Sequence, residues 1–273
     1  MKINPVTNSL NFQSTSRRYT DSNGDPFGCF TMFFRDDLNW EKLSEFELEH
    51  FKKKDEVNVV MFASSDGSEA YSKIISLLEN PIEQKKPQAK KFFPIHAFDV
   101  DDEIVKTAKS GYIKATSFDI VEIISRTNKY TDYFQKSEEK LNIANDITQG
   151  NLVLKAKAAL TDRVKFNKGD MFKEIRKIKD NSNTILMCRN ILGYFLNDKI
   201  EEFIKLASEF LKRGSLFVIG DYDHSYIDIG KIIENNNFKK VFFHFLILNL
   251  FFKICFYFIF ISRICMNYIP LWF

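Results

Sequence analysis

The sequence predicts an α/β fold with a mostly parallel, doubly wound sheet. Short apolar runs, among them 57–62 (VNVVMF) and 184–188 (TILMC), have the length and composition of strands buried on both faces. Segments with apolar residues at helical spacing lie between these runs, and strands that alternate with such helices are joined by parallel crossovers. The 273 residues suffice for one main domain with small additions.

The first half of the expected domain is organised around 57–72 (VNVVMFASSDGSEAYS). The segment 31–35 (TMFFR) opens the ordered chain, and an amphipathic helix is expected over 36–54. The strand at 57 then leads into a small polar turn, and the helix after it, 68–78, ends before Pro81. Ligands bind beyond the carboxyl ends of strands in open α/β sheets, so this turn is a candidate cofactor site. The alternative is a junction that binds nothing, which is common for such turns.

The second half follows in the same alternating order. The expected elements are a strand within 92–101 (FFPIHAFDVD), a helix over 102–109 stopped by Gly111, a charged insertion to 150 without a predicted shape, a short strand at 164–166, the strand 184–188, a helix over 198–211 and a strand at 215–220 (SLFVIG).

The composition argues against several classes of function. The 39 basic and 36 acidic residues leave a net charge of +3, which is too small to indicate a nucleic-acid partner. The four cysteines show no CxxC pattern and the four histidines no HExxH spacing, so neither a disulfide framework nor a metal site is predicted. This cysteine usage fits a reducing cytoplasm.

Two tails are expected to flank the domain, which we place at 29–241. Residues 1–28 are polar, lack the apolar core of a secretory signal and are expected to be disordered. Residues 242–273 form a phenylalanine-rich apolar tail, and the run 241–261 is about as long as a membrane-spanning helix. Lys253 lies within that run, and inserting it costs about 3 kcal/mol. Three alternatives remain open: a membrane anchor, a continuation of the sheet, or residues without a selected function, such as those from a shifted reading frame.

Four polar side chains lie where strands are expected to end. Asp99 closes the second strand, where an acid of a doubly wound fold accepts hydrogen bonds from a ribose diol. The alternative is a helix cap, for which all the acids within 99–102 are suited. Arg189 and Asn190 follow an apolar strand, with Tyr194 close behind, at the expected ligand crevice. The alternative for these three is an ordinary surface end of a strand.

Five segments resemble successive motifs of the CheR family. They are 31–36 (TMFFRD), 64–72 (SSDGSEAYS), 97–101 (AFDVD), 187–195 (MCRNILGYF) and 211–220 (LKRGSLFVIG). The family consists of S-adenosylmethionine-dependent methyltransferases that esterify glutamates of chemotaxis receptors, and the T-x-FFR and CRN-x-x-x-YF motifs are specific to it. The resemblance implies a Rossmann-like class I methyltransferase fold, S-adenosylmethionine as the cofactor, and a protein substrate with an acceptor glutamate, for example in a chemoreceptor.

The resemblance also implies roles for individual residues. Thr31 and Arg35 match the segment that folds over the cofactor, and Glu69 matches an acid of the turn. Asp99 matches the ribose-binding acid, and Asp170 and Met171 match the pair on the adenine side. Arg189 and Asn190 match the residues at the sulfonium end, and Tyr194 matches the tyrosine near the methyl group. Arg35 is the candidate for orienting the acceptor carboxylate, because a guanidinium binds a carboxylate bidentately. Tyr194 is the candidate for supporting the acceptor with its hydroxyl. A glutamate with a pKa near 4.3 is already ionised at neutral pH, so no general base is required.

The sequence departs from the family pattern in several places. Ser68 stands where the family has the first glutamate of the turn, and Asp170 where it has an asparagine. The helical N-terminal domain that grips receptors is expected to be missing, and no receptor-tethering β-subdomain is evident. These departures support a second hypothesis, a methyltransferase-like binding module without turnover. A third hypothesis, a dinucleotide-dependent oxidoreductase, is weakened by the lack of a GxGxxG motif.

Overall fold

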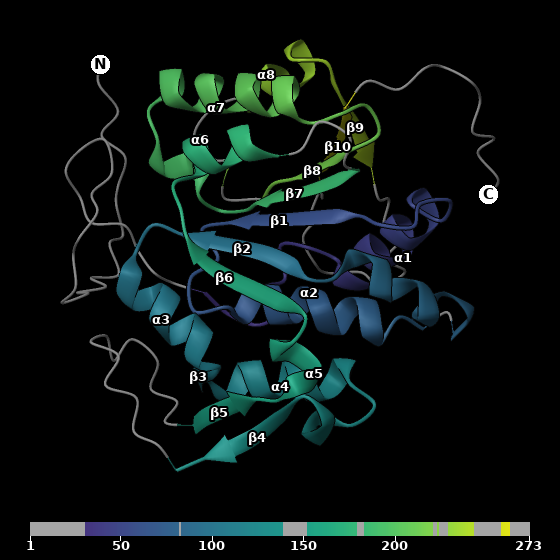
Figure 1. The fold of residues 1–273 in the computed structure, drawn as a ribbon, viewed down its shortest axis with the longest axis vertical. Helices are drawn as coiled ribbons and strands as arrows, with labels where there is room; N and C mark the ends of the chain where they lie inside the picture. Colours follow the sequence, from purple (N-terminus) through teal and green to yellow (C-terminus); the bar gives the residue numbers. More distant parts are fainter. Residues whose placement is uncertain are drawn as a thin grey trace, which may run out of the picture.

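The computed structural model describes residues 31–81, 83–138, 152–178, 183–220, 223, 229–242 and 258–262. A seven-stranded sheet lies between two layers of helices, and a smaller sheet lies beside one of these layers (Figure 1). The main sheet has the order β6-β2-β1-β7-β8-β10-β9. Its strands are β1 (Asn58–Phe62), β2 (Ile95–Asp99), β6 (Val164–Lys168), β7 (Thr184–Cys188), β8 (Leu216–Val218), β9 (Phe238–Phe242) and β10 (Phe258–Ser262).

The strands β6, β2, β1, β7 and β8 run parallel to one another, with β1 in the middle between β2 and β7. Side chains alternate between the two faces of β1. Val59 and Met61 belong to one hydrophobic core, and Val60 and Phe62 to the other. Both faces of the strand are therefore covered, which confirms the predicted doubly wound arrangement and explains the unbroken apolar run in the sequence.

The helices divide between the two cores. The first layer contains α1 (Trp40–His50), α2 (Ser68–Leu78), α3 (Asp102–Ser110) and α5 (Ala158–Thr161), and the second contains α6 (Met171–Glu174), α7 (Asn197–Phe210) and α8 (Ile229–Asn235). Short 3-10 helices are η1 (Glu83–Phe92), η2 (Tyr130–Asp132), η3 (Ile175–Lys177) and η4 (Leu192–Tyr194). The helix expected over 36–54 begins only at Trp40. Its start is set by Asn39, whose side chain accepts a hydrogen bond from Lys42 N at 2.8 Å.

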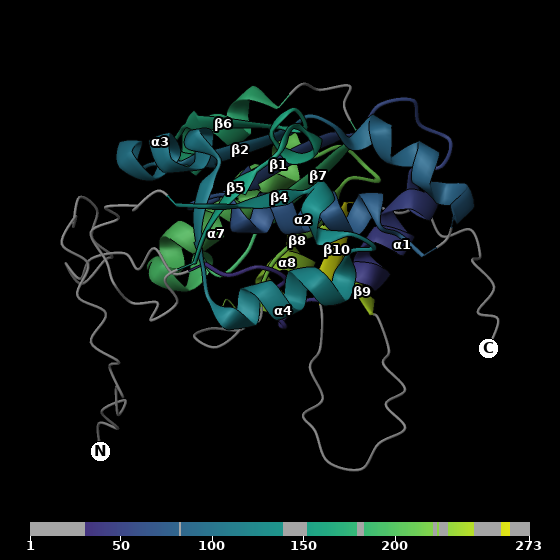
Figure 2. The same cartoon turned by 90° about the horizontal axis from the view of Figure 1, so that it is seen from below.

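The charged insertion contains a small antiparallel sheet, a β-subdomain that is not evident from the sequence. Its strands are β3 (Tyr112–Ala115), β4 (Phe134–Ser137) and β5 (Leu152–Ala156), in the order β3-β5-β4. The helix α4 (Ser117–Arg126) connects β3 to β4 in the sequence (Figure 2). The strands have four or five residues each, and Ile113 pairs with the distant Leu154. Strands this short, paired across such a separation, leave little trace in the local sequence pattern.

One strand of the main sheet, β10, lies beyond the boundary expected at residue 241. Strand β10 lies antiparallel between β8 and β9, with Phe260 opposite both Phe217 and Lys240. The described part of the phenylalanine-rich tail therefore continues the sheet, which suits its aromatic and β-branched residues. No helix in the described part of the chain is both long and apolar enough to cross a bilayer. Residues 1–28 and 243–257 lie outside the described residues.

Candidate functional site

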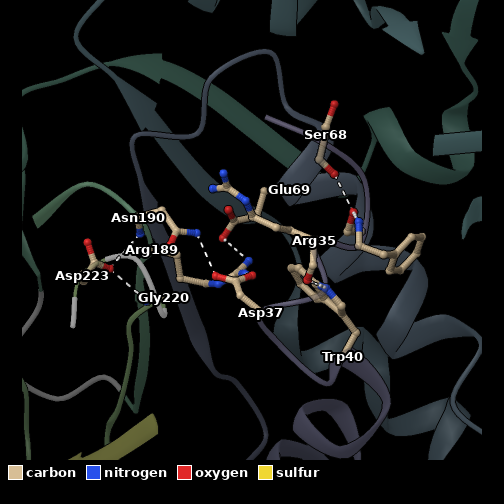
Figure 3. A network of polar contacts seen from close by, with 11 residues as sticks. Arg35, Asp37, Trp40, Ser68, Glu69, Arg189, Asn190, Gly220 and Asp223 are labelled. Carbon is tan, nitrogen blue, oxygen red and sulfur yellow. Dashed lines mark hydrogen bonds and ion pairs between the residues drawn. The ribbon is translucent and has the colours of Figure 1, made fainter. Parts of the chain in front are cut away.

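Four adjacent parallel strands end at one edge of the sheet, and each leads into a segment that the sequence singles out. The turn 63–67 follows β1, Asp99 ends β2, Asp170 follows β6 and Arg189 follows β7. A fifth segment, residues 31–39, is called the strap below. Its residues Arg35 and Asp37 lie beside Glu69 and Arg189 at this edge (Figure 3).

The turn after β1 is compact because its backbone adopts unusual conformations. Ala63, Ser65 and Gly67 all have positive φ, at 53°, 49° and 95°. A Cβ on Gly67 would lie 2.6 Å from Cζ of Phe166, so only glycine fits there without a shift of that ring. The side chain of Asp66 accepts hydrogen bonds from both the amide and the hydroxyl of Ser68, and burial raises its pKa to about 6. The turn therefore brings backbone close to the sheet edge without bulky side chains.

Asp99 lies next to this turn and does not cap a helix. Its Oδ2 accepts a hydrogen bond from Ser65 N at 2.9 Å, and its Oδ1 accepts one from Asp101 N at 3.1 Å. The cap of α3 is Asp101, which accepts from the amides of Glu103 and Ile104. Burial raises the pKa of Asp99, while the amide hydrogen bonds favour its ionised form. An ionised carboxylate has about four acceptor positions, so Asp99 retains capacity for a further donor beside these amides.

Arg189 is the centre of charge at the site. Its side chain is fully buried and forms ion pairs with Asp37 and with Glu69, the latter at 3.1 Å. The guanidinium lies 5.0 Å from the centre of the Trp40 ring. Burial lowers the pKa of Arg189, but the negative charges of Glu69 and Asp37 have the larger effect, so the pKa of Arg189 is raised. Burial also raises the pKa of Glu69, against the attraction of Arg189. This guanidinium thus holds the strap and the start of α2 at the end of β7.

Asn190 connects the strap to the end of β8. Its φ is 57°, its Nδ2 donates to Asp37 Oδ2 at 2.9 Å, and its backbone amide donates to Asp223 Oδ2 at 2.7 Å. Asp223 also accepts from the amides of Gly220, Leu192 and Gly193. A Cβ on Gly220 would lie 2.2 Å from Asn190 Oδ1, so the close approach of these two residues requires glycine (Figure 3).

The structure shows the local surroundings of the remaining predicted residues. Asp170 caps α6 by accepting from the amides of Phe172 and Lys173, and Met171 is buried in the second core. Tyr194 is half-buried in η4, and Thr31 is half-buried at the start of the described chain. Arg35 extends toward Glu69, and its charge favours the ionised form of that carboxyl.

Three residues at the site escape prediction from the sequence: Asp37, Trp40 and Asp223. Asp37 directly follows the TMFFRD motif, and Asp223 follows the strand at 215–220 just as Asp99 closes its own strand. The rule that singled out Asp99, an acid at the end of a buried strand, also applies to Asp223. Trp40 carries no comparable signal, because its spacing is that of a core residue of an amphipathic helix.

The chain was compared with curated protein sequences, solved structures and family models. No curated protein sequence matches the chain. Solved structures similar to it include a TehB-like SAM-dependent methyltransferase from Corynebacterium glutamicum, with 11% identity, a TM-score of 0.39, and coverage of 81% of this chain and 88% of that one. Another is magnesium protoporphyrin IX methyltransferase from Synechocystis with bound SAM, with 11% identity, a TM-score of 0.37, and coverage of 82% and 79%.

The family model described as "CheR methyltransferase, SAM binding domain" matches residues 29–228, well over half of the sequence. The matched range includes the strap, the turn after β1, and the ends of β2, β6 and β7. The chain therefore belongs to the CheR methyltransferase family and carries that family's S-adenosylmethionine-binding domain.

Proposed function

We propose that this methyltransferase transfers a methyl group from S-adenosylmethionine to the carboxylate of a protein glutamate and forms a methyl ester. One observation carries the proposal: the acids described at the sheet edge are already engaged. Arg189 pairs with Asp37 and Glu69, whereas Asp99 and Asp223 accept backbone amides. An acceptor that needs no deprotonation suits such a site, and a glutamate carboxylate needs none.

The residues at the edge fit the cofactor of the family. When bound, S-adenosylmethionine supplies an activated methyl group on a sulfonium. Nε of Arg189 is buried and has no hydrogen-bond acceptor among the described residues, so a donor is available for the cofactor's carboxylate. Asp99 would hold the ribose hydroxyls through its remaining acceptor capacity, and Glu69 would attract the ammonium group.

The protein's own contribution is alignment. Arg35 reaches the site from a strap that is held by Arg189 and Asn190, so the chain behind its guanidinium is fixed. A fixed guanidinium orients a carboxylate through two parallel hydrogen bonds. Correct orientation of two reacting groups contributes roughly 7–11 kcal/mol to a barrier. Tyr194, half-buried on the same edge, would support the acceptor through its hydroxyl.

The described histidines do not supply a base at this edge. His50 contacts the carbonyl of Gly214, which precedes β8 and so lies toward the opposite end of the strands, at 2.7 Å through its Nε2. His96 lies within β2. An alcohol or amine acceptor would have to lose a proton during the reaction, whereas an ionised carboxylate becomes an ester without releasing one. This difference favours the carboxylate.

Two measurements test the proposal. Calorimetric titration with S-adenosylmethionine and S-adenosylhomocysteine tests binding, and transfer of labelled methyl groups to a chemoreceptor fragment tests turnover. We expect binding, and label that is released by mild base, as a methyl ester requires. Label that survives base would exclude the ester. Binding without transfer to any protein offered would favour the alternative of a binding module, which the serine at position 68 of the turn supports.

A further inference from the structure

We propose that Asp119, on α4 of the small subdomain, is a positioning residue that sets the conformation of the strap and thereby the position of Arg35. The proposal relies on the proposed function for the role of Arg35 in binding the acceptor. Asp119 is 4% exposed, and its Oδ1 accepts a hydrogen bond from the backbone amide of Phe33 at 2.9 Å. This bond joins two segments that lie 86 residues apart in the sequence.

The other oxygen of Asp119 is used to start its own helix. Asp119 Oδ2 accepts from the amide of Thr116 at 2.8 Å and from its hydroxyl at 2.7 Å, and the Thr116 hydroxyl accepts from the amide of Asp119. This is a capping box, which fixes the carboxylate relative to α4. The oxygen that faces the strap is therefore held in place by the oxygen that faces the helix.

The next amide of the strap is anchored to a different helix. Phe34 N donates to Ser72 Oγ on α2 at 2.9 Å, and that hydroxyl donates to the carbonyl of Ser68 at 2.8 Å. Phe34 has a φ of 46°, a left-handed conformation that is unfavourable for a residue with a Cβ. Two consecutive amides bound to two separate helices hold the chain in this conformation.

The turn at Phe34 separates the buried rings of the strap from its polar part. The ring of Phe33 packs edge-on against Phe134 at 5.4 Å between centroids, and the ring of Phe34 packs edge-on against Trp40 at 6.0 Å. The chain then leaves the core at Arg35, whose carbonyl accepts from Trp40 Nε1 at 3.2 Å. A shift of the Phe33 amide would therefore move the residue that we expect to bind the acceptor.

Asp119→Glu separates the two roles of the carboxylate. Glutamate is a usual residue at this position of a capping box, so the start of α4 is retained, but the carboxylate moves away from the Phe33 amide by one methylene. Thr116→Ala is the matched control, because it removes the hydroxyl from the helix cap but keeps the Thr116 amide as a donor to Asp119 Oδ2, so the carboxylate stays beside the Phe33 amide. The readouts are hydrogen exchange of the Phe33 and Phe34 amides, affinity for S-adenosylhomocysteine, and kcat and KM for methyl transfer.

In Asp119→Glu we expect exchange of the two amides to be at least about tenfold faster and kcat to fall at least about tenfold. Thr116→Ala should keep both values within about twofold of the wild type, even if its unfolding midpoint is lower. Wild-type exchange in Asp119→Glu, or equal acceleration in both variants, would overturn the proposal. If the wild-type protein fails to bind S-adenosylhomocysteine, the proposed function is refuted, whereas the exchange experiment still tests the anchoring of the strap.

Discussion

Replacing Arg189 by methionine tests the electrostatic organisation of the site. The substitution keeps an apolar stem in the buried space but removes the positive charge between Asp37 and Glu69. Removing one partner of a buried ion pair costs about 3–5 kcal/mol, because the remaining charge is left uncompensated. The two acidic side chains retain 13% and 17% exposure, which gives them some hydration, so we expect the lower end of that range, about 3 kcal/mol.

The assay is urea unfolding of the wild type and of Arg189→Met at pH 7.5 and pH 5. Without the guanidinium, the pKa of Glu69 should rise further, since burial already raises it. A raised acid pKa penalises the ionised form at higher pH, so the loss of stability should be largest at pH 7.5 and smaller at pH 5. Glu69→Gln added to Arg189→Met should recover part of the loss, because it removes one of the two unpaired charges. A loss below about 1 kcal/mol, or one that is the same at both pH values, would refute this reasoning.

Two further predictions concern charged side chains other than Arg189 and its two partners. Burial raises the pKa of Asp66 to about 6, from 3.8, so its ionised form penalises the fold above pH 6 by up to about 3 kcal/mol, and the penalty vanishes below about pH 4. Asp66→Asn keeps an acceptor for Ser68 and should raise the unfolding free energy at pH 8 but not at pH 4; an equal change at both pH values would contradict the assignment. Lys73 and Glu47 form an ion pair in which both side chains are fully buried. Lys73→Met should cost about 3–5 kcal/mol in chemical unfolding, and Lys73→Met with Glu47→Leu should recover most of it; a double variant no more stable than the single one would speak against this account.

The parallel half of the fold is predictable because its signals are local. Strands β1 and β7 are unbroken apolar runs, and α2 begins after a glycine turn and ends before Pro81. Strand β10 and the small sheet are different. Their stabilisation comes from partners far along the chain, such as Ile113 with Leu154, and no local periodicity records that pairing.

The candidate site likewise has features with a local signal in the sequence and features that depend on distant partners. The position of Asp99 at the end of a strand follows from the sequence. The sequence does not show that Asp101, and not Asp99, caps α3 and so leaves the Asp99 carboxylate at the sheet edge. The ion pair between Arg189 and Asp37 joins residues 152 positions apart, and only the folded sheet brings them together. The left-handed backbone conformation of Phe34 is also not predictable from the sequence, since aromatic residues rarely adopt it.

The most direct test of the central claim is the affinity of the wild type and of Asp99→Ala for S-adenosylhomocysteine. The account predicts that the wild type binds and that the variant binds at least tenfold more weakly, about 1.4 kcal/mol, from loss of the ribose hydrogen bonds. Asp102→Ala is the control, because Asp102 is a nearby acid in an exposed ion pair with Lys168 and should leave the affinity unchanged. Equal affinities of the wild type and Asp99→Ala would contradict the placement of the cofactor at this edge of the sheet.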